Sequence, residues 1–316
     1  MNVGVIGCGY WGKKHIEAYE KIKTIKLRRI CDVDQSKLNH PGVQASADYR
    51  DILKDPAIKA VSIVTPDHTH YKICKDCLLS SKHVLLEKPM ALNYRDAYDL
   101  YSTAKRENLV LLIGHLYKFD QVLKTVKKKL AQNLIGEIRH IHIAWEDYLI
   151  PSWPRDIVYD LGSHAVVILN DLIGLDIIRN RSRVSYCANG QAEAQIDLGY
   201  KTAEARINLS WSASRKKRTA YLEGTKGCCT VDFISQSIRL EKNSEVRCVH
   251  VTKSMNLDRE LIHFVDIIMG KKKTQLISAE SGCKVIKTLD CLSSDSLPET
   301  GYDPHKQKNL ISRVNF

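Results

Sequence analysis

The first fifteen residues, "MNVGVIGCGYWGKKH" (1–15), place a short apolar segment directly before three closely spaced glycines. Glycine loses more conformational freedom on folding than any other residue, so three of them together indicate a special steric requirement. The spacing of Gly7, Gly9 and Gly12 is G-x-G-x-x-G. Between a strand and a helix, the first glycine permits a tight turn, the second lets the backbone approach a pyrophosphate, and the third allows close helix–strand packing.

The context supports a phosphate-binding loop over an ordinary glycine turn without a ligand, which is the alternative. Residues 3–7 are predicted to form a strand, 11–22 a helix and 26–31 a second strand that ends at Asp32. A carboxylate there would accept hydrogen bonds from the adenosine ribose hydroxyls and repel a 2′-phosphate. Neither Val33 nor Asp34 offers a compensating cation, so the sequence favours NAD over NADP.

Apolar strands and helices go on alternating up to about residue 118. Strands are predicted at 60–65, 83–88 and 109–115, and helices at 47–54, 69–80 and 93–107. This alternation is typical of a parallel sheet with helices on both faces. We therefore predict an α/β protein whose residues 1–118 form a Rossmann-type, NAD(P)-binding domain.

The pattern changes near residue 119. A predicted helix (119–133) leads into segments such as "GEIRHIHIAWEDYL", "QAEAQIDLGY" and "TAEARINLSW", in which apolar and polar residues alternate. Such alternation indicates antiparallel strands with one face in solvent. Two helices (259–270 and 278–294) and a polar tail follow. We expect 119–316 to form an α+β domain with a large, mostly antiparallel open sheet, and the basic run 215–218 to lie in a turn between strands.

Composition excludes several function classes. Apolar residues make up 44% and charged residues 27% of the 316 residues, as in soluble globular proteins. With neither a signal peptide nor an apolar span, we expect a cytoplasmic protein without membrane contact. The basic residues are mostly scattered along the chain, which argues against nucleic-acid binding. The net charge of +12 suits an anionic substrate. The twelve histidines show no metal-ligand spacing, so no metal is expected.

Further motifs point to one family. The segments "TPDHTH" (65–70), "HVLLEKPM" (83–90) and "DLGSH" (160–164) occur in this order after the glycine loop. Together they resemble the Gfo/Idh/MocA family of NAD(P)-dependent oxidoreductases (glucose–fructose oxidoreductase, inositol dehydrogenase, rhizopine catabolism). The similarity covers nearly the whole chain. Departures include Ser81, where the family usually has glycine, and Ala165, which replaces a common acidic residue and leaves the substrate's identity open.

The resemblance implies a catalytic role for Lys88. Its ammonium would lie near the nicotinamide and the reacting carbon, at the seam of the two domains, and stabilise negative charge on the substrate oxygen. The family also implies a cis Lys88–Pro89 peptide bond. The alternative is that Lys88 merely ends a strand and points to water.

Asp160 and His164 form the second implied catalytic pair. Residues four apart share one face if the segment is helical. His164, with an ordinary pKa near ~6.5, would be the general acid/base, and Asp160 would bind a substrate hydroxyl or orient the imidazole. The alternative is a structural histidine on an apolar helix face.

Other positions are predicted to line the site. His115 and Tyr117 end the last strand of the first domain and are candidate substrate contacts, or else simple linker packing. The aromatic pair Tyr10 and Trp11 resembles family members that act on sugars. The remaining predicted cofactor-binding residues are Tyr10, Trp11, Thr65, Pro66, His68 and Glu87, with Lys88.

The predicted function is hydride transfer between NAD(H) and a hydroxyl or keto carbon of a sugar or nucleotide-linked sugar. Two alternatives stay open: a non-catalytic NAD(P)-binding regulator, and a reductase of a non-sugar cyclic substrate. The open sheet face further predicts a homodimer or homotetramer.

Overall fold

The computed structural model describes residues 1–150, 155–187, 189–253 and 255–293, which fall into two compact units. The first unit contains Met1–Phe119 and Met255–Lys287, and the second contains the described parts of Asp120–Ser254 and Thr288–Phe316. Residues 255–287 thus belong to the first unit, whereas the sequence analysis grouped them with the second domain. None of the helices in the described ranges is long and apolar enough to cross a membrane.

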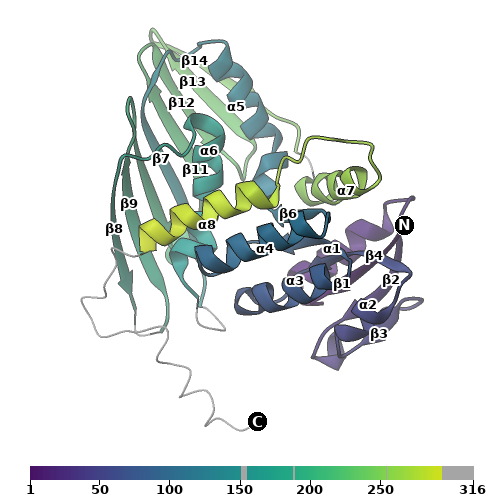
Figure 1. The fold of residues 1–316 in the computed structure, drawn as a ribbon. Coiled ribbons are helices and arrows are strands. Elements are labelled where there is room, and N and C mark those ends of the chain that lie inside the picture. Colours follow the sequence, from purple (N-terminus) through teal and green to yellow (C-terminus); the bar gives the residue numbers. More distant parts are fainter. Residues whose placement is uncertain (151–154, 188, 254, 294–316) are drawn as a thin grey trace. The chain divides into compact units, whose positions relative to one another are not determined.

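The first unit is built on a six-stranded parallel sheet (Figure 1). Its strand order is β3-β2-β1-β4-β5-β6, so the direction of winding reverses between β1 and β4. This confirms the predicted Rossmann-type α/β class. The strands are β1 (Asn2–Ile6), β2 (Lys26–Cys31), β3 (Gln44–Ser46), β4 (Ile58–Ile63), β5 (His83–Glu87) and β6 (Leu111–Gly114). The helices between them are α1 (Tyr10–Glu20), α2 (Arg50–Lys54), α3 (His70–Leu79) and α4 (Tyr94–Arg106), with short 3-10 turns η1 (Gln35–Lys37), η2 (Asp67–Thr69) and η3 (Leu116–Phe119).

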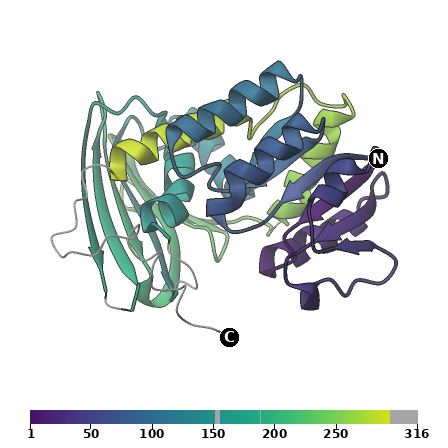
Figure 2. The same ribbon diagram turned by 60° about the horizontal axis from the view of Figure 1, so that its bottom comes forward.

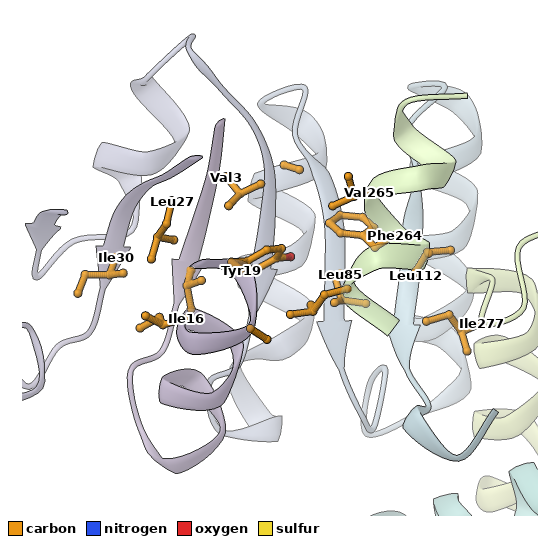
Figure 3. Close-up of a cluster of buried hydrophobic side chains, with 14 of the residues drawn as sticks. Val3, Ile16, Tyr19, Leu27, Ile30, Leu85, Leu112, Phe264, Val265 and Ile277 are labelled. Atoms are coloured by element: carbon orange, nitrogen blue, oxygen red, sulfur yellow. The ribbon is translucent and has the colours of Figure 1, made fainter. Parts of the chain in front are cut away.

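Helix α7 (Asn256–Ile268) completes the core of the first unit. Its buried residues Phe264 and Val265 pack in the same cluster as Val3 of β1 and Tyr19 of α1 (Figure 3). The Tyr19 hydroxyl lies 2.7 Å from the Ser62 hydroxyl of β4, which satisfies a polar group inside this core. Burial of this apolar face explains why the chain returns to the first unit after its second sheet.

The second unit holds an eight-stranded sheet in the order β14-β13-β12-β11-β7-β10-β9-β8. All neighbours are antiparallel except β7 and β10. Helices α5 (Gln121–Ala131) and α6 (Ser163–Ile173) lie along one face (Figure 1), and no helix among the described residues covers the other (Figure 2). The predicted open sheet is thereby confirmed. The strands are β7 (Ile138–Tyr148), β8 (Arg179–Tyr186), β9 (Ala192–Gly199), β10 (Glu204–Ser210), β11 (Ser212–Gly224), β12 (Gly227–Asp232), β13 (Ser237–Lys242) and β14 (Glu245–His250). Helix α8 (Ala279–Ser293) belongs to the first unit up to Lys287 and to the second unit from Thr288 on.

The basic run 215–218 lies inside β11, so the expected turn was wrong. The reason is that Arg218 is not a solvated charge: its guanidinium lies 5.1 Å from the centroid of the Trp145 ring. It also donates to the Glu146 carbonyl at 2.5 Å and to the Asp147 carboxylate at 2.9 Å. These contacts with β7 hold the segment in the sheet.

Ser81 offers a test of local backbone strain. It has a φ of 59°, in the left-handed region that favours glycine. We expect Ser81→Gly to raise the free energy of unfolding by about 0.5–1 kcal/mol, after allowance for glycine's freedom in the unfolded chain. The neighbouring Ser80 has a φ of −96°, so Ser80→Gly should lower stability instead. Urea unfolding that shows both variants equally destabilised would contradict this explanation.

Candidate active site

The glycine loop follows β1 and has the geometry of a phosphate cradle. Gly7 has a φ of +96°, and a Cβ atom on it would collide with the carbonyl oxygen of Val64. A Cβ on Gly12 would collide with the carbonyl oxygen of Gly7. A Cβ on Gly9, by contrast, would meet no atom within 4 Å. Gly7 and Gly12 therefore allow backbone segments to approach closely in the turn, and Gly9 leaves open space beside the N-terminus of α1.

The N-terminus of α1 is available for an anion. Gly9 is its N-cap and supplies no side chain to cap the first backbone N–H groups. Such groups, together with the positive end of the helix dipole, attract phosphate. Tyr10 and Trp11 follow, 73% and 44% exposed, with their rings in edge contact at 5.8 Å between centroids. The loop thus fits the pyrophosphate of a dinucleotide.

Asp32 is fixed where β2 ends. One carboxylate oxygen accepts the backbone N–H of Cys8 at 2.7 Å, and the other accepts that of Asp34 at 2.9 Å. Its side chain is 11% exposed, so an edge remains open to a ribose hydroxyl. Sequence reasoning missed Lys37, whose ammonium lies 4.0 Å from Asp32 and 3.1 Å from Asp34. Lys37 is already paired with these carboxylates, and Asp32 keeps the geometry expected for NAD.

Glu87 and Lys88 follow at the end of β5. The Lys88–Pro89 bond is cis, as the resemblance implied. The Glu87 carboxylate accepts the backbone N–H of Lys88 at 3.1 Å and lies 3.2 Å from Nε2 of His15. Burial opposes ionisation of Glu87, but the hydrogen bond from His15 and the positive charges of His15 and Lys88 lower its pKa. Lys88 itself is half-buried.

His70 joins two of the predicted site segments and was missed by sequence reasoning. Its side chain is buried, and its two ring nitrogens lie 2.7 Å from the carbonyl oxygen of Pro89 and 2.9 Å from that of Thr65. The Thr65 hydroxyl in turn accepts a hydrogen bond from Thr69 at 2.7 Å. His70 therefore ties the segment after Lys88 to the loop after β4.

The strand register brings the predicted residues of the first unit to one edge of its sheet. Ile6 pairs with Cys31 and with Ile63, and Glu87 pairs with Gly114. The residues that follow these strand ends therefore all lie at the carboxyl edge, where ligands bind in open α/β sheets. They are the glycine loop, Asp32, Thr65, Pro66, His68, Lys88, His115 and Tyr117.

Two of these residues differ sharply in exposure. The His68 side chain is 59% exposed, and its imidazole lies 3.8 Å from Asp67. His115 is only 3% exposed, and burial, helped by the charge of Lys118, lowers its pKa to about 3. His115 is therefore neutral at pH 7. Tyr117 is half-buried in η3.

Asp160 and His164 lie in the second unit, on a helical segment whose first turn is a π-helix (Val158–Gly162) that leads into α6. Single π turns are frequent at functional sites. The Asp160 carboxylate lies 3.3 Å from the Arg155 guanidinium. The His164 ring is half-buried, with its centroid 5.7 Å from that of Trp145. Arg155 and Trp145 were missed by sequence reasoning.

The fold and this edge define a class: oxidoreductases with an NAD-binding Rossmann domain and a second, open-sheet domain. Residues 1–115 match the family model described as "Oxidoreductase family, NAD-binding Rossmann fold". Residues 123–230 match the model "GFO/IDH/MocA C-terminal domain". The chain therefore belongs to the Gfo/Idh/MocA family, and the predicted family and NAD-type cofactor are confirmed.

The individual relatives named here share 30% or less of their residues with the chain. The chain is 30% identical to myo-inositol 2-dehydrogenase of Thermotoga maritima over 152 residues, which are 46% of each protein. In such sequence matches it spans about half the length of the curated relatives. UDP-N-acetylglucosamine 3-dehydrogenase of Acidithiobacillus ferrooxidans has the same fold, with a TM-score of 0.82, 22% identity and coverage of 94% and 97% of the two chains. Levoglucosan dehydrogenase in complex with NADH and levoglucosan has a TM-score of 0.84, 18% identity and coverage of 94% and 97%.

The two contacts of His70 predict a measurable loss of stability. Burial lowers the pKa of His70, so its ring is neutral and its one N–H donates to only one of the two carbonyl groups. His70→Leu leaves that carbonyl without its donor and should lower the free energy of unfolding by about 1–3 kcal/mol. The matched control is His68→Leu, because the His68 side chain is 59% exposed and should change stability by less than about 0.5 kcal/mol. Equal urea midpoints for the two variants would show that His70 does not join the two segments.

Proposed function

We propose that the chain is an NAD-dependent dehydrogenase that interconverts a hydroxyl and a keto carbon of a sugar or nucleotide-linked sugar. The observation that carries the proposal is the gathering, at one sheet edge, of a dinucleotide-type glycine loop, Asp32 and the Glu87–Lys88 segment. The names of the relatives support it, since they include an inositol, a levoglucosan and a nucleotide-sugar dehydrogenase.

The first unit would hold the cofactor through its own backbone and one carboxylate. The N–H groups at the start of α1 would bind the pyrophosphate above Gly9, and Asp32 would bind the adenosine ribose. When bound, NAD supplies the hydride acceptor, and NADH the donor for the reverse reaction. Further predicted contacts are Tyr10, Trp11, Thr65, Pro66, His68 and Glu87.

The proton is handled by this chain's own residues. His164 would take the proton from the substrate hydroxyl, and Lys88 would donate a hydrogen bond to the same oxygen as negative charge grows on it. Asp160, held by Arg155, would bind a neighbouring hydroxyl or orient His164. The product is a ketone and a protonated imidazole, and the reverse reaction returns that proton.

The charge balance favours an anionic substrate. The chain carries a net charge of +12. In the second unit Arg155 is a guanidinium beside the predicted catalytic pair, and Arg218 lies over the Trp145 ring that contacts His164. A phosphate or carboxylate on the substrate is therefore part of the proposal.

Removal of either catalytic group should stop turnover without releasing the cofactor. Lys88→Ala and His164→Ala should each lower kcat at least about a hundredfold, because a positioned acid or base typically contributes about 10²–10⁴-fold. NADH affinity should change little. Absorbance at the reduced-nicotinamide band, with a panel of sugars and nucleotide sugars, gives the rate.

The matched controls are Lys59→Ala and His250→Ala, both of exposed residues, which should keep the parent's rate. Near-normal turnover in a site variant would reject that residue's role. A parent that binds NADH but turns over no member of the panel would favour the NAD-binding regulator.

The open face of the second sheet is proposed to bind a second copy of the chain, giving a homodimer or homotetramer. This face carries a hollow of about 770 Å³ between β7 and β11 on one side and β8 on the other. Its charges are of both signs, as a self-complementary surface requires: Arg206 pairs with Asp197 at 2.6 Å, and Arg179 pairs with Glu204.

Light scattering tests this association. The parent should have at least twice the mass of one 35.9 kDa chain. Tyr221→Glu places a charge in the hollow and should shift the protein toward the monomer, whereas Tyr98→Glu, on α4, should not. A parent that stays a 35.9 kDa monomer at all concentrations rules the association out.

A further inference from the structure

Several buried polar atoms around Glu87 have no hydrogen-bond partner within the described part of the chain. They are Nδ1 of His15, both ring nitrogens of His115, and both carboxyl oxygens of Glu260. These residues are 1%, 3% and 0% exposed and come from α1, the end of β6 and α7. Buried polar groups in native proteins are almost always satisfied, so these atoms require a partner that the described residues do not supply.

Glu87 links the three residues. It lies 3.2 Å from the other nitrogen of His15, and its charge acts on both His115 and Glu260. The packing of helix α7 brings Glu260 toward Glu87, because Phe264 and Val265 of this helix pack in the same cluster as Tyr19 of α1 and Leu85 of β5 (Figure 3). Glu260 lies one turn before Phe264 on the same helix.

The carboxyl groups of Glu87 and Glu260 have opposite surroundings. Glu87 accepts a backbone N–H and has the positive charges of His15 and Lys88 beside it. Glu260 makes no ion pair with any of the described residues, and burial, followed by the negative charge of Glu87, raises its pKa well above the ordinary value. Environments that separate two carboxyl pKa values in this way leave one group ionised and the other neutral at pH 7.

We propose that Glu260 is held as a neutral acid and, with His15 and His115, binds buried water against Glu87, which makes Glu260 a positioning residue for the Glu87–Lys88 segment. Water suits these atoms because it can donate to a ring nitrogen of His115 and accept from the hydroxyl of a protonated Glu260. Only the effect on Lys88 rests on the proposed function. The titratable or charged groups on the surrounding elements are His15 and Tyr19 on α1, Glu87 and Lys88 at β5, His115 and Lys118 beyond β6, and His263 on α7 itself.

A neutral Glu260 matters because a second carboxylate would compete with the first. Two ionised carboxyl groups at one buried site repel each other, and one of them takes up a proton or draws in a cation. With Glu260 neutral, the single negative charge of Glu87 acts on His15 and Lys88. The ammonium of Lys88 is then available to donate a hydrogen bond to the substrate oxygen, because it does not have to balance a second buried carboxylate.

The stability of Glu260→Gln tests the proton directly. An acid whose pKa is raised in the folded state loses its proton first in the unfolded chain, near pH ~4.3 for glutamate. Its stabilising contribution is therefore lost as the pH rises above that value, while glutamine does not titrate. The melting temperature of Glu260→Gln, relative to the parent, should increase steadily from pH 5 to pH 8. A difference that is the same at every pH would overturn the proposal.

Glu17→Gln is the matched control, since Glu17 is an exposed glutamate on α1. Its melting-temperature difference from the parent should not grow with pH. If Glu260→Gln does not fold, infrared spectroscopy of the parent decides the question. The carbonyl stretch of a protonated carboxylic acid should be present at pH 7, and its absence contradicts a neutral Glu260.

Activity separates this inference from the proposed function. Glu260→Leu removes the water partner and should lower kcat at least about tenfold with NADH affinity unchanged, since small displacements of a catalytic group are costly. Glu260→Gln should restore kcat close to the parent's. Equal rates for the two variants would remove the positioning role. A parent without turnover would instead reject the proposed function, and the stability and infrared results would still decide the state of Glu260.

Discussion

The close approach of α1 to the end of β1 is the constraint on which the rest of the first unit depends. A side chain at Gly7 or Gly12 would collide with backbone atoms, so only glycine allows this turn. The turn places the Cys8 N–H on the Asp32 carboxylate and leaves the first N–H groups of α1 without a side-chain cap. It also brings Tyr19 into the core beside α7. One steric requirement therefore fixes the glycine loop, the position of the Asp32 carboxylate and the packing of α7 in the core.

The proposed chemistry lies at the carboxyl edge of the first sheet, where the surroundings of each titratable group decide whether it is charged. His15 and Lys88 beside Glu87 lower its pKa, whereas the buried Glu260 forms no ion pair within the part of the chain that the structure describes. His115 is neutral for the same reason that Glu260 is, since burial disfavours a charge of either sign. With Glu260 and His115 neutral, Glu87 carries the one negative charge among these three groups, and it lies next to Lys88. In the second unit, Arg155 and Asp160 form a comparable ion pair beside His164.

Sequence alone predicted those parts that depend on local pattern. The glycine spacing, the apolar strands and the position of Asp32 are encoded within thirty-two residues, and the structure has them at the expected places. Strand β3 was missed because it has only three residues, and β14 because its six residues are mostly exposed and give only a short apolar pattern. His70 and Arg218 were missed because their roles depend on partners that other strands and loops supply. The His15–Glu87 contact joins residues 72 apart in the chain, which no local pattern reveals.

Calorimetric titration with NADH, applied to the parent and to Gly9→Val, tests the central claim that a dinucleotide binds over the first β–α turn. A Cβ on Gly9 meets no atom within 4 Å, so this variant should fold, with a melting temperature somewhat below the parent's because valine is a poorer N-cap than glycine. The added side chain fills the space above α1 that the pyrophosphate needs. The account predicts saturable binding of NADH to the parent and none to the folded variant. A parent that releases no heat with NADH, or a folded variant that binds it as tightly as the parent does, would contradict the account.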